Sequence, residues 1–178
     1  NRATILWLVI TILSLLCSLL IPNFLTITNL QNLLSRFAPV CIIVFAQLLV
    51  VILGYADLSV GAAMSLSTCI ASYLLIQDVF TGILAIVATG FLIGLFNGLL
   101  TVKLEINPFG ATLGTLFLLE GISLTLRPYP GGSIHELLLN AWRANFLGIP
   151  LFPFLTIIFT IAAFGFIFNK TYIGTHIR

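Results

Sequence analysis

Long stretches without a single charged side chain divide this sequence of 178 residues. No Asp, Glu, Lys or Arg occurs in 3–35, 37–56, 58–77, 79–102, 106–119 or 144–169. A helix that crosses a bilayer needs about 20 mostly apolar residues, and most of these stretches reach that length. Only 7% of the residues are charged, whereas a soluble domain has about 25%. The sequence therefore predicts an all-α, polytopic integral membrane protein.

We expect about six transmembrane or re-entrant helices, at about 3–21, 38–54, 58–76, 79–102, 108–126 and 150–169. Between the first two, the helical spacing of apolar residues in 23–36 predicts a loop or a short helix on the membrane surface. The longest polar piece, 127–149, predicts an ordered excursion outside the membrane. With the N-terminus inside, four Lys and Arg residues are cytoplasmic and three are external, which favours an external excursion.

Several classes of function find no support in the composition. The net charge of +2 is too small to indicate a nucleic-acid partner. Cys17, Cys41 and Cys69 have no CxxC spacing, so we expect small buried side chains and not metal ligands. His135 and His176 lie in different predicted loops, without a nucleophile or ligand cluster. We expect no catalytic residue, metal or cofactor on this chain, and no phosphate loop of the form GxxxxGK[ST] occurs in it.

Two series of glycines are expected to pack helices. Gly90, Gly94 and Gly98 follow one another at a spacing of four, which is close to one helical turn, and Gly110 and Gly114 repeat this spacing in the next apolar segment. Such a stripe of small residues lets another helix approach closely. Two stripes in neighbouring segments predict a compact bundle.

The stretch GYADLSVG places a carboxylate between two apolar segments. A charged side chain at membrane depth costs about 2.5–3.5 kcal/mol on insertion scales. Two interpretations remain open. Either Asp57 or Ser59 caps the next helix in a tight turn at the membrane surface, or the helix is broken inside the bundle, where Asp57 and freed backbone groups line a polar route.

A second polar stretch, INPFGATLGTLFLLEGISL, begins with the signals of a helix start. Pro108 suits the first turn of a helix, and Asn107 before it is then a natural N-cap. Further along, Glu120 is expected to be neutral or to pair with Arg127, which follows seven positions later on roughly the same helix face.

Both stretches are similar to signatures of one family. GYADLSVGAAMSL resembles the DLSVG signature of the membrane permeases of ribose/simple-sugar-type ABC importers, and GLFNGLLTVKLEINPFGATLGTLFLLEGISL resembles the NG, PF and TLG stretch of the same family. The pieces NFLTITNLQNLL and KTYIGTHIR also occupy matching places. Because members of the family are much longer than this chain, the resemblance implies that residues 1–178 are the N-terminal part of one permease domain.

The resemblance implies a machine of several chains in the bacterial cytoplasmic (inner) membrane. Permeases of this family pair as homo- or heterodimers among the membrane lipids. An external or periplasmic binding protein delivers the solute, and a separate cytoplasmic ATP-binding cassette subunit binds ATP and drives alternating access. The chain is then expected to be a transport subunit that imports a small hydroxylated solute. A monosaccharide is the solute that we expect most.

The motif positions carried over from the family define candidate pathway residues. They are Asp57, Ser59, Asn97, Asn107, Phe109 and Thr112. Their donors and acceptors match sugar hydroxyls, and Phe109 would offer an apolar face to a sugar ring. Asn97 is otherwise expected to make a hydrogen bond between helices. Two alternatives stay open, an ion-coupled secondary transporter or channel that uses Asp57 and Glu120, and a membrane scaffold without a solute path.

Overall fold

Helices make up nearly all of the structure, a computed structural model that describes residues 2–170. The elements are α1 (Arg2–Leu20), α2 (Ile27–Ile52), α3 (Val60–Leu74), α4 (Val79–Gly98), the π turn η1 (Leu99–Lys103), α5 (Pro108–Leu126), α6 (Glu136–Arg143), β1 (Asn145–Phe146), β2 (Ile149–Pro150) and α7 (Leu151–Lys170). Five helices, namely α1, α2, α4 with η1, α5 and α7, are long and apolar enough to cross a membrane. The predicted all-α polytopic architecture is confirmed.

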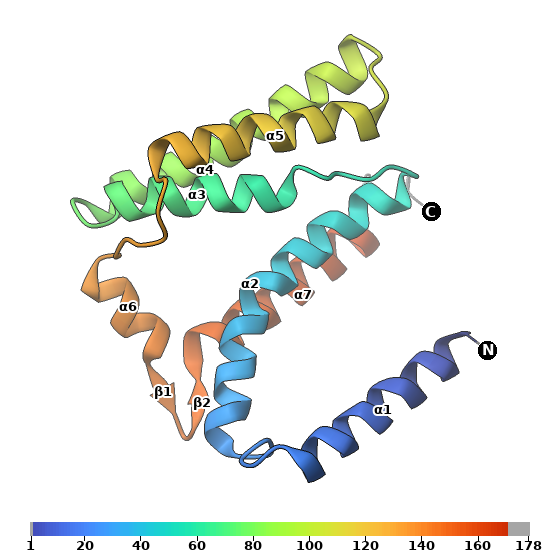
Figure 1. Ribbon diagram of the computed structural model, residues 1–178, viewed down its shortest axis with the longest axis vertical. Coiled ribbons are helices and arrows are strands. Elements are labelled where there is room, and N and C mark those ends of the chain that lie inside the picture. The colour runs from blue at the N-terminus through green and yellow to red at the C-terminus, as the bar shows by residue number, and fades with distance from the viewer. Residues whose placement is uncertain (1, 171–178) are drawn as a thin grey trace.

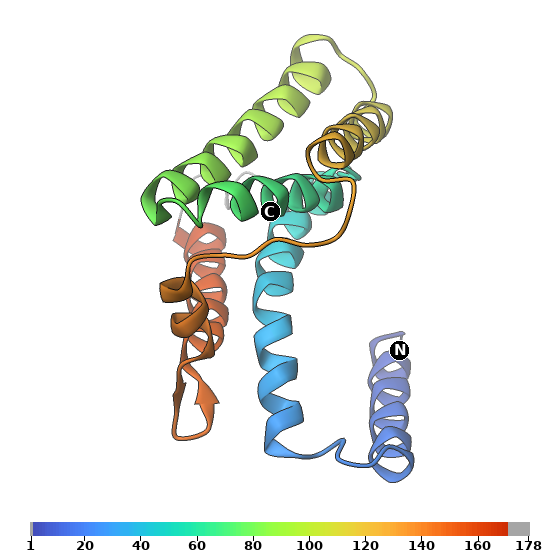
Figure 2. The same cartoon turned by 60° about the vertical axis from the view of Figure 1, so that its left-hand side comes forward.

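The helices form two packed groups (Figure 1). In one group α3 packs against α4 and α5, and in the other α2 and α7 lie side by side. The rings of Phe45 in α2 and Phe164 in α7 have centroids 4.7 Å apart. Helix α1 stands apart from both groups in Figures 1 and 2, and none of its apolar window is buried. Its apolar side chains are therefore suited to contact with lipid.

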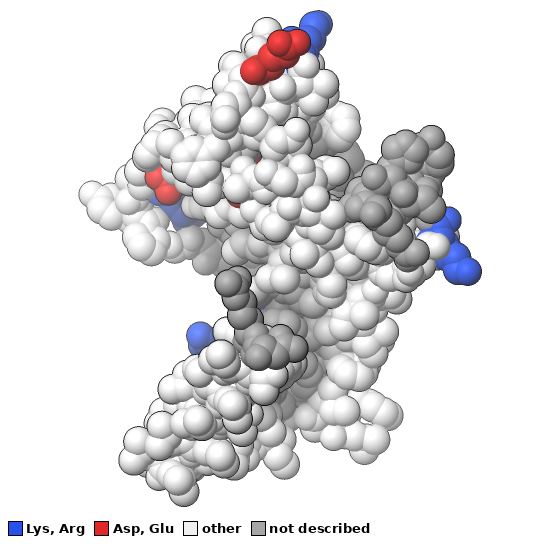
Figure 3. Space-filling model, turned by 90° about the vertical axis from the view of Figure 1, so that its right-hand side faces the viewer, with Lys and Arg blue, Asp and Glu red and all other residues white. Residues whose placement is uncertain are grey.

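The distribution of charge fits a membrane protein. Figure 3 shows one face of the molecule on which most side chains are uncharged and the Lys, Arg, Asp and Glu residues lie mainly toward the edges. The core between α3 and α5 is formed by small and branched side chains, with Ala62 and Leu66 of α3 buried against Leu119 of α5. Small residues allow this close approach, because in a bilayer helix packing depends on van der Waals contact.

Within the described residues, the glycine stripes do not lie at a close contact between helices, which is the role predicted for them. A Cβ atom added to any of these glycines would meet nothing within 4 Å in the described residues, which holds for Gly90, Gly94, Gly98, Gly110 and Gly114. Each step of four residues turns about 40° beyond a full helical turn, so the stripe on α4 drifts around the helix. The face of α4 that meets α3 and α5 carries Gly82, Ile93 and Asn97 instead.

Helix α2 is continuous where the sequence predicted a separate surface piece over 23–36 and a span only from 38. Thr26 caps the helix by accepting the Asn29 N–H through its Oγ1 at 3.3 Å. Pro39 lies inside the helix and lacks the N–H that would bind the carbonyl one turn earlier. Figure 1 shows α2 changing direction along its length, as a proline kink would produce. The predicted surface helix is therefore the first part of α2.

The excursion 127–149 contains α6 and the hairpin of β1 and β2. Gln31 of α2 donates through Nε2 to the Gly148 carbonyl at 2.8 Å. Tyr73 of α3 donates its hydroxyl to the Leu126 carbonyl at 2.8 Å, and the Arg127 guanidinium lies 4.6 Å from the centroid of the Tyr73 ring. The excursion is therefore held against the start of α2 and the end of α3.

We predict that Gly82→Ala destabilises the contact between α3 and α4. The new methyl group would lie 2.9 Å from the Leu75 backbone nitrogen and overlap its side chain, and such overpacking costs about 1–3 kcal/mol. The Tm of the protein in detergent, measured by size-exclusion chromatography after heating, should fall. Gly90→Ala is the matched control, because its methyl has room within this chain. Equal losses in both variants would contradict the packing assigned to Gly82.

Candidate functional site

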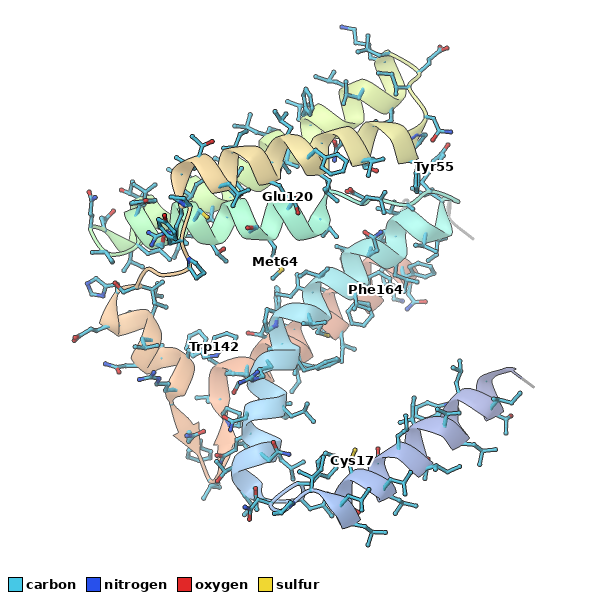
Figure 4. All side chains as sticks on the ribbon, in the orientation of Figure 1. Cys17, Tyr55, Met64, Glu120, Trp142 and Phe164 are labelled. Atoms are coloured by element: carbon cyan, nitrogen blue, oxygen red, sulfur yellow. The ribbon has the colours of Figure 1, made fainter. Side chains whose placement is uncertain are left out.

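The polar motifs meet in a pocket of about 500 Å³ at one end of the α3–α5 group. This volume is typical of small-molecule sites, which measure about 300–1,000 Å³. Figure 4 shows Tyr55 in the linker that follows α2, near the start of α5. The polar and aromatic side chains that line the pocket are Tyr55, Asp57, Asn97, Thr101, Glu105, Asn107 and Thr112.

One wall of the pocket is the break between α2 and α3. Gly54, with φ of +82°, follows α2, and α3 begins at Val60 instead of the predicted 58. Asp57 accepts two hydrogen bonds at Oδ1, from the Ser59 N–H at 2.8 Å and from the Ser59 hydroxyl at 2.6 Å. Gln47 of α2 donates through Nε2 to the Asp57 carbonyl at 3.1 Å. The same carboxylate thus stabilises the start of α3 and lines the pocket.

A second wall is formed where the chain leaves α4. The sequence predicted a regular helix over 79–102, but the α-helix ends at Gly98 and continues as the wider π turn Leu99–Lys103. Glu105 then adopts φ of +54° and the chain reverses. π turns recur at functional sites. Here the turn places Thr101 and Glu105 on the pocket.

The start of α5 completes the pocket. Asn107 Oδ1 accepts the Phe109 N–H at 3.0 Å and Pro108 is the first helical residue, so the predicted N-cap is confirmed. Thr112 is 4% exposed, and its hydroxyl lies 2.8 Å from the Pro108 carbonyl and 3.4 Å from the Ala56 carbonyl. The start of α5 is thereby held against the linker.

The buried Asn97 side chain links the start of α3 to α5. Its Nδ2 donates to the Ser59 hydroxyl at 2.9 Å, and its Oδ1 accepts from the Thr115 hydroxyl at 2.6 Å. All three side chains are buried, and buried polar groups are stable only when they are hydrogen-bonded. The predicted hydrogen bond from Asn97 to another helix is confirmed, and Asn97 also contributes to the pocket lining.

The charge of the pocket is negative. Asp57 and Glu105 are among the lining residues, and no Lys or Arg of the described residues 2–170 lines the pocket. Such a surface offers acceptors to hydroxyl and ammonium groups and disfavours anions.

Glu120 takes no part in this pocket. It lies along α5 away from Tyr55 in Figure 4 and is exposed. Its predicted partner Arg127 stacks on Tyr73, and the contacts of residues 2–170 include no ion pair between Glu120 and Arg127. The pairing considered from sequence is therefore not formed.

Four of the six predicted pathway residues line the pocket, namely Asp57, Asn97, Asn107 and Thr112. Ser59 is 1% exposed and lies behind the wall, while Phe109 is 56% exposed and lies outside the lining. Sequence reasoning missed Tyr55, Thr101, Glu105 and the buried Thr115. Helical spacing from Asn97 and Thr112 could have indicated the two threonines.

Another pocket of about 500 Å³ lies between α2 and α7 but lacks groups for a polar solute. Its two hydroxyl side chains, Thr156 and Thr160, donate to carbonyls of their own helix at 2.8 and 2.7 Å. The remaining lining is apolar. The pocket at the α2–α3 break is therefore the candidate functional site.

A bundle of membrane-spanning helices with a small polar pocket at a helix break is typical of membrane permeases. A family profile described as the permease component of branched-chain amino acid transport systems matches residues 29–178. The chain belongs to this permease family, and it is a multi-pass protein of the bacterial inner membrane.

Curated relatives of the chain include several sugar permeases. It is 33% identical to the ribose import permease RbsC of Bacillus subtilis, over 92% of this chain and 52% of that protein. It is 31% identical to the L-arabinose ABC transporter permease AraH of Azospirillum brasilense, over 99% and 52%, and 30% identical to the galactose/methyl galactoside import permease MglC of Escherichia coli, over 63% and 38%. The predicted resemblance is confirmed. The chain spans about half the length of its first relatives, and no solved structure matches it.

We predict that Asn97→Leu destabilises the α3–α5 group. The hydroxyls of Ser59 and Thr115 would lose their shared partner, and each lost hydrogen bond costs about 0.5–1.5 kcal/mol. The Tm in detergent should fall accordingly. Asn32→Leu is the control, because Asn32 is exposed on α2. An equal fall in the Tm of Asn32→Leu would show that the Asn97 side chain stabilises the protein no more than an exposed asparagine does.

Proposed function

We propose that this chain is part of the permease subunit of an ATP-binding-cassette importer that moves a monosaccharide across the cytoplasmic membrane. The observation that carries the proposal is the pocket, where Asp57, Asn97, Asn107 and Thr112 come together at a helix break. The names of the relatives, which are permeases for ribose, L-arabinose and galactose, support this class of solute.

The lining suits a neutral polyhydroxylated ring. The Asp57 carboxylate accepts from sugar hydroxyls through the acceptor sites that Ser59 leaves open. Asn107 uses Oδ1 to cap α5, which leaves its amide hydrogens as donors. Tyr55 lines the pocket and Phe109 does not, so we assign the apolar face for the sugar ring to Tyr55 instead of Phe109.

The charge of the pocket argues against an amino acid as the solute. An amino acid brings a carboxylate, and the part of the chain that the structure describes places no Lys or Arg in the lining to pair with it. Burying an unpaired carboxylate is strongly unfavourable. A sugar without charge avoids this penalty, so the pocket agrees better with the named sugar permeases than with the amino acid transport in the description of the family.

The partners follow from this function. A separate cytoplasmic ATPase supplies the ATP-binding site, an external or periplasmic protein delivers the sugar, and a second permease copy completes the membrane domain. The excursion 127–149, which we expect on the external side, would meet the delivering protein.

Replacing Asp57 and Asn107 by Ala together should lower sugar uptake at least tenfold. Each side chain is assigned about one hydrogen bond to the solute, worth about 1 kcal/mol net, and about 1.4 kcal/mol corresponds to a factor of ten. Uptake of labelled ribose, arabinose and galactose is measured in cells that carry the full-length permease, its ATPase and its binding protein. Asn32→Ala serves as the control. Uptake at the control level in the double variant would remove both residues from the pathway.

The energy source separates the ABC importer from the ion-coupled alternative. Inactivating the phosphate loop of the partner ATPase should abolish uptake, whereas an ionophore that collapses ion gradients at constant cellular ATP should leave uptake unchanged. The opposite pattern, with uptake dependent on the gradient and independent of the ATPase, would favour an ion-coupled transporter.

A further inference from the structure

A chain of hydrogen-bonded side chains leads from the interior of α5 to the pocket. The Thr115 hydroxyl lies 2.6 Å from Asn97 Oδ1, Asn97 Nδ2 lies 2.9 Å from the Ser59 hydroxyl, and that hydroxyl lies 2.6 Å from Asp57 Oδ1. Thr115 is 2% exposed and does not line the pocket. The chain thus links a residue remote from the solute to the carboxylate that faces it.

The bonds in this chain all point the same way. A side-chain amide has one donor side and one acceptor side, so a hydroxyl that donates to Asn97 Oδ1 turns Nδ2 toward Ser59. Ser59 then accepts from Asn97 and has its single hydroxyl hydrogen left for Asp57. Bonds in series in a low-dielectric interior strengthen one another. The direction of all the hydrogen bonds in this series therefore depends on the Thr115 hydroxyl, at the end remote from the pocket.

The Thr115 hydroxyl also has an alternative acceptor in its own helix. It lies 3.0 Å from the Ala111 carbonyl, the kind of bond that Thr125 makes to the Gly121 carbonyl at 2.8 Å. The Thr115 hydroxyl lies closer to Asn97 Oδ1, at 2.6 Å, than to the Ala111 carbonyl. The single hydroxyl hydrogen is thus placed to orient Asn97, with the Ala111 carbonyl as the competing acceptor.

We propose that Thr115 is a positioning residue for Asp57, acting through Asn97 and Ser59. By fixing the direction of the chain, it holds the carboxylate oxygen in the orientation that accepts from a sugar hydroxyl. This assignment rests on the proposed function, because the role of Thr115 is defined by the hydrogen bond that the Asp57 carboxylate accepts from the sugar.

The first test replaces the hydroxyl in the full-length permease, assembled with its ATPase and binding protein. Thr115→Val should lower uptake per permease molecule in the membrane about fivefold, equivalent to one net hydrogen bond of about 1 kcal/mol. Thr115→Ser keeps the hydroxyl and should retain most of the uptake. Thr125→Val is the matched control on the same helix, exposed and bonded only to its own backbone, and should match the wild type.

The second test repeats Thr115→Val in a permease that carries Asp57→Ala. If Thr115 acts through the carboxylate, the second substitution lowers uptake no further, because the group that it positions is gone. A general structural role predicts the same fivefold loss in both backgrounds. That result, or wild-type uptake in Thr115→Val alone, would overturn the proposal while leaving sugar import intact.

A third measurement is independent of the transported solute. In detergent, Thr115→Val and Ser59→Ala should lower the Tm by less together than the sum of their separate losses, because both interrupt the same chain. Additive losses would overturn the proposal even if uptake of every sugar were absent. Absent sugar uptake in the wild type would refute the proposed function, and non-additive Tm losses would then still show that Thr115 and Ser59 act through one series of hydrogen bonds.

Discussion

The structure depends on satisfying the polar groups of a broken helix inside an apolar protein. A polar backbone group without a partner costs several kcal/mol in a bilayer, so the break between α2 and α3 needs donors from its neighbours. Gln47 of α2 binds the Asp57 carbonyl, and Asn97 of α4 reaches the Asp57 carboxylate through Ser59. Because these partners come from different helices, the break also fixes how the helices stand relative to one another.

The same constraint explains where recognition is possible. Ser59 and Thr115 are buried with their bonds made, so they support the site without offering groups to a solute. Asp57 and Asn107 each spend part of their hydrogen-bonding capacity on the start of a helix and keep the rest. In a pocket built from helix starts in this way, the side chains that hold the helix starts in place also keep a few donors and acceptors for other partners.

The spans and the cap at Asn107 could be predicted, since they depend on local signals such as apolar length and a proline in the first turn. The continuous helix through Pro39 could not, because an internal proline usually kinks or ends a helix. The π turn before Glu105 and the close approach of Gly82 to Leu75 were not predicted either. The glycine stripe on α4 illustrates the limit. Its spacing identifies one helix face, but tertiary contacts decide that the neighbouring face carrying Asn97 meets α3 and α5.

The two helix groups are tied together at both ends. At the pocket end the linker 53–59 joins α2 to α3, and at the other end the excursion 127–149 is bonded to Gln31 of α2 and approached by Tyr73 of α3. Two helix groups connected by two links form a closed mechanical loop. If each group moves as a unit, a change in separation at one end is matched by rotation at the other end or by bending of a link.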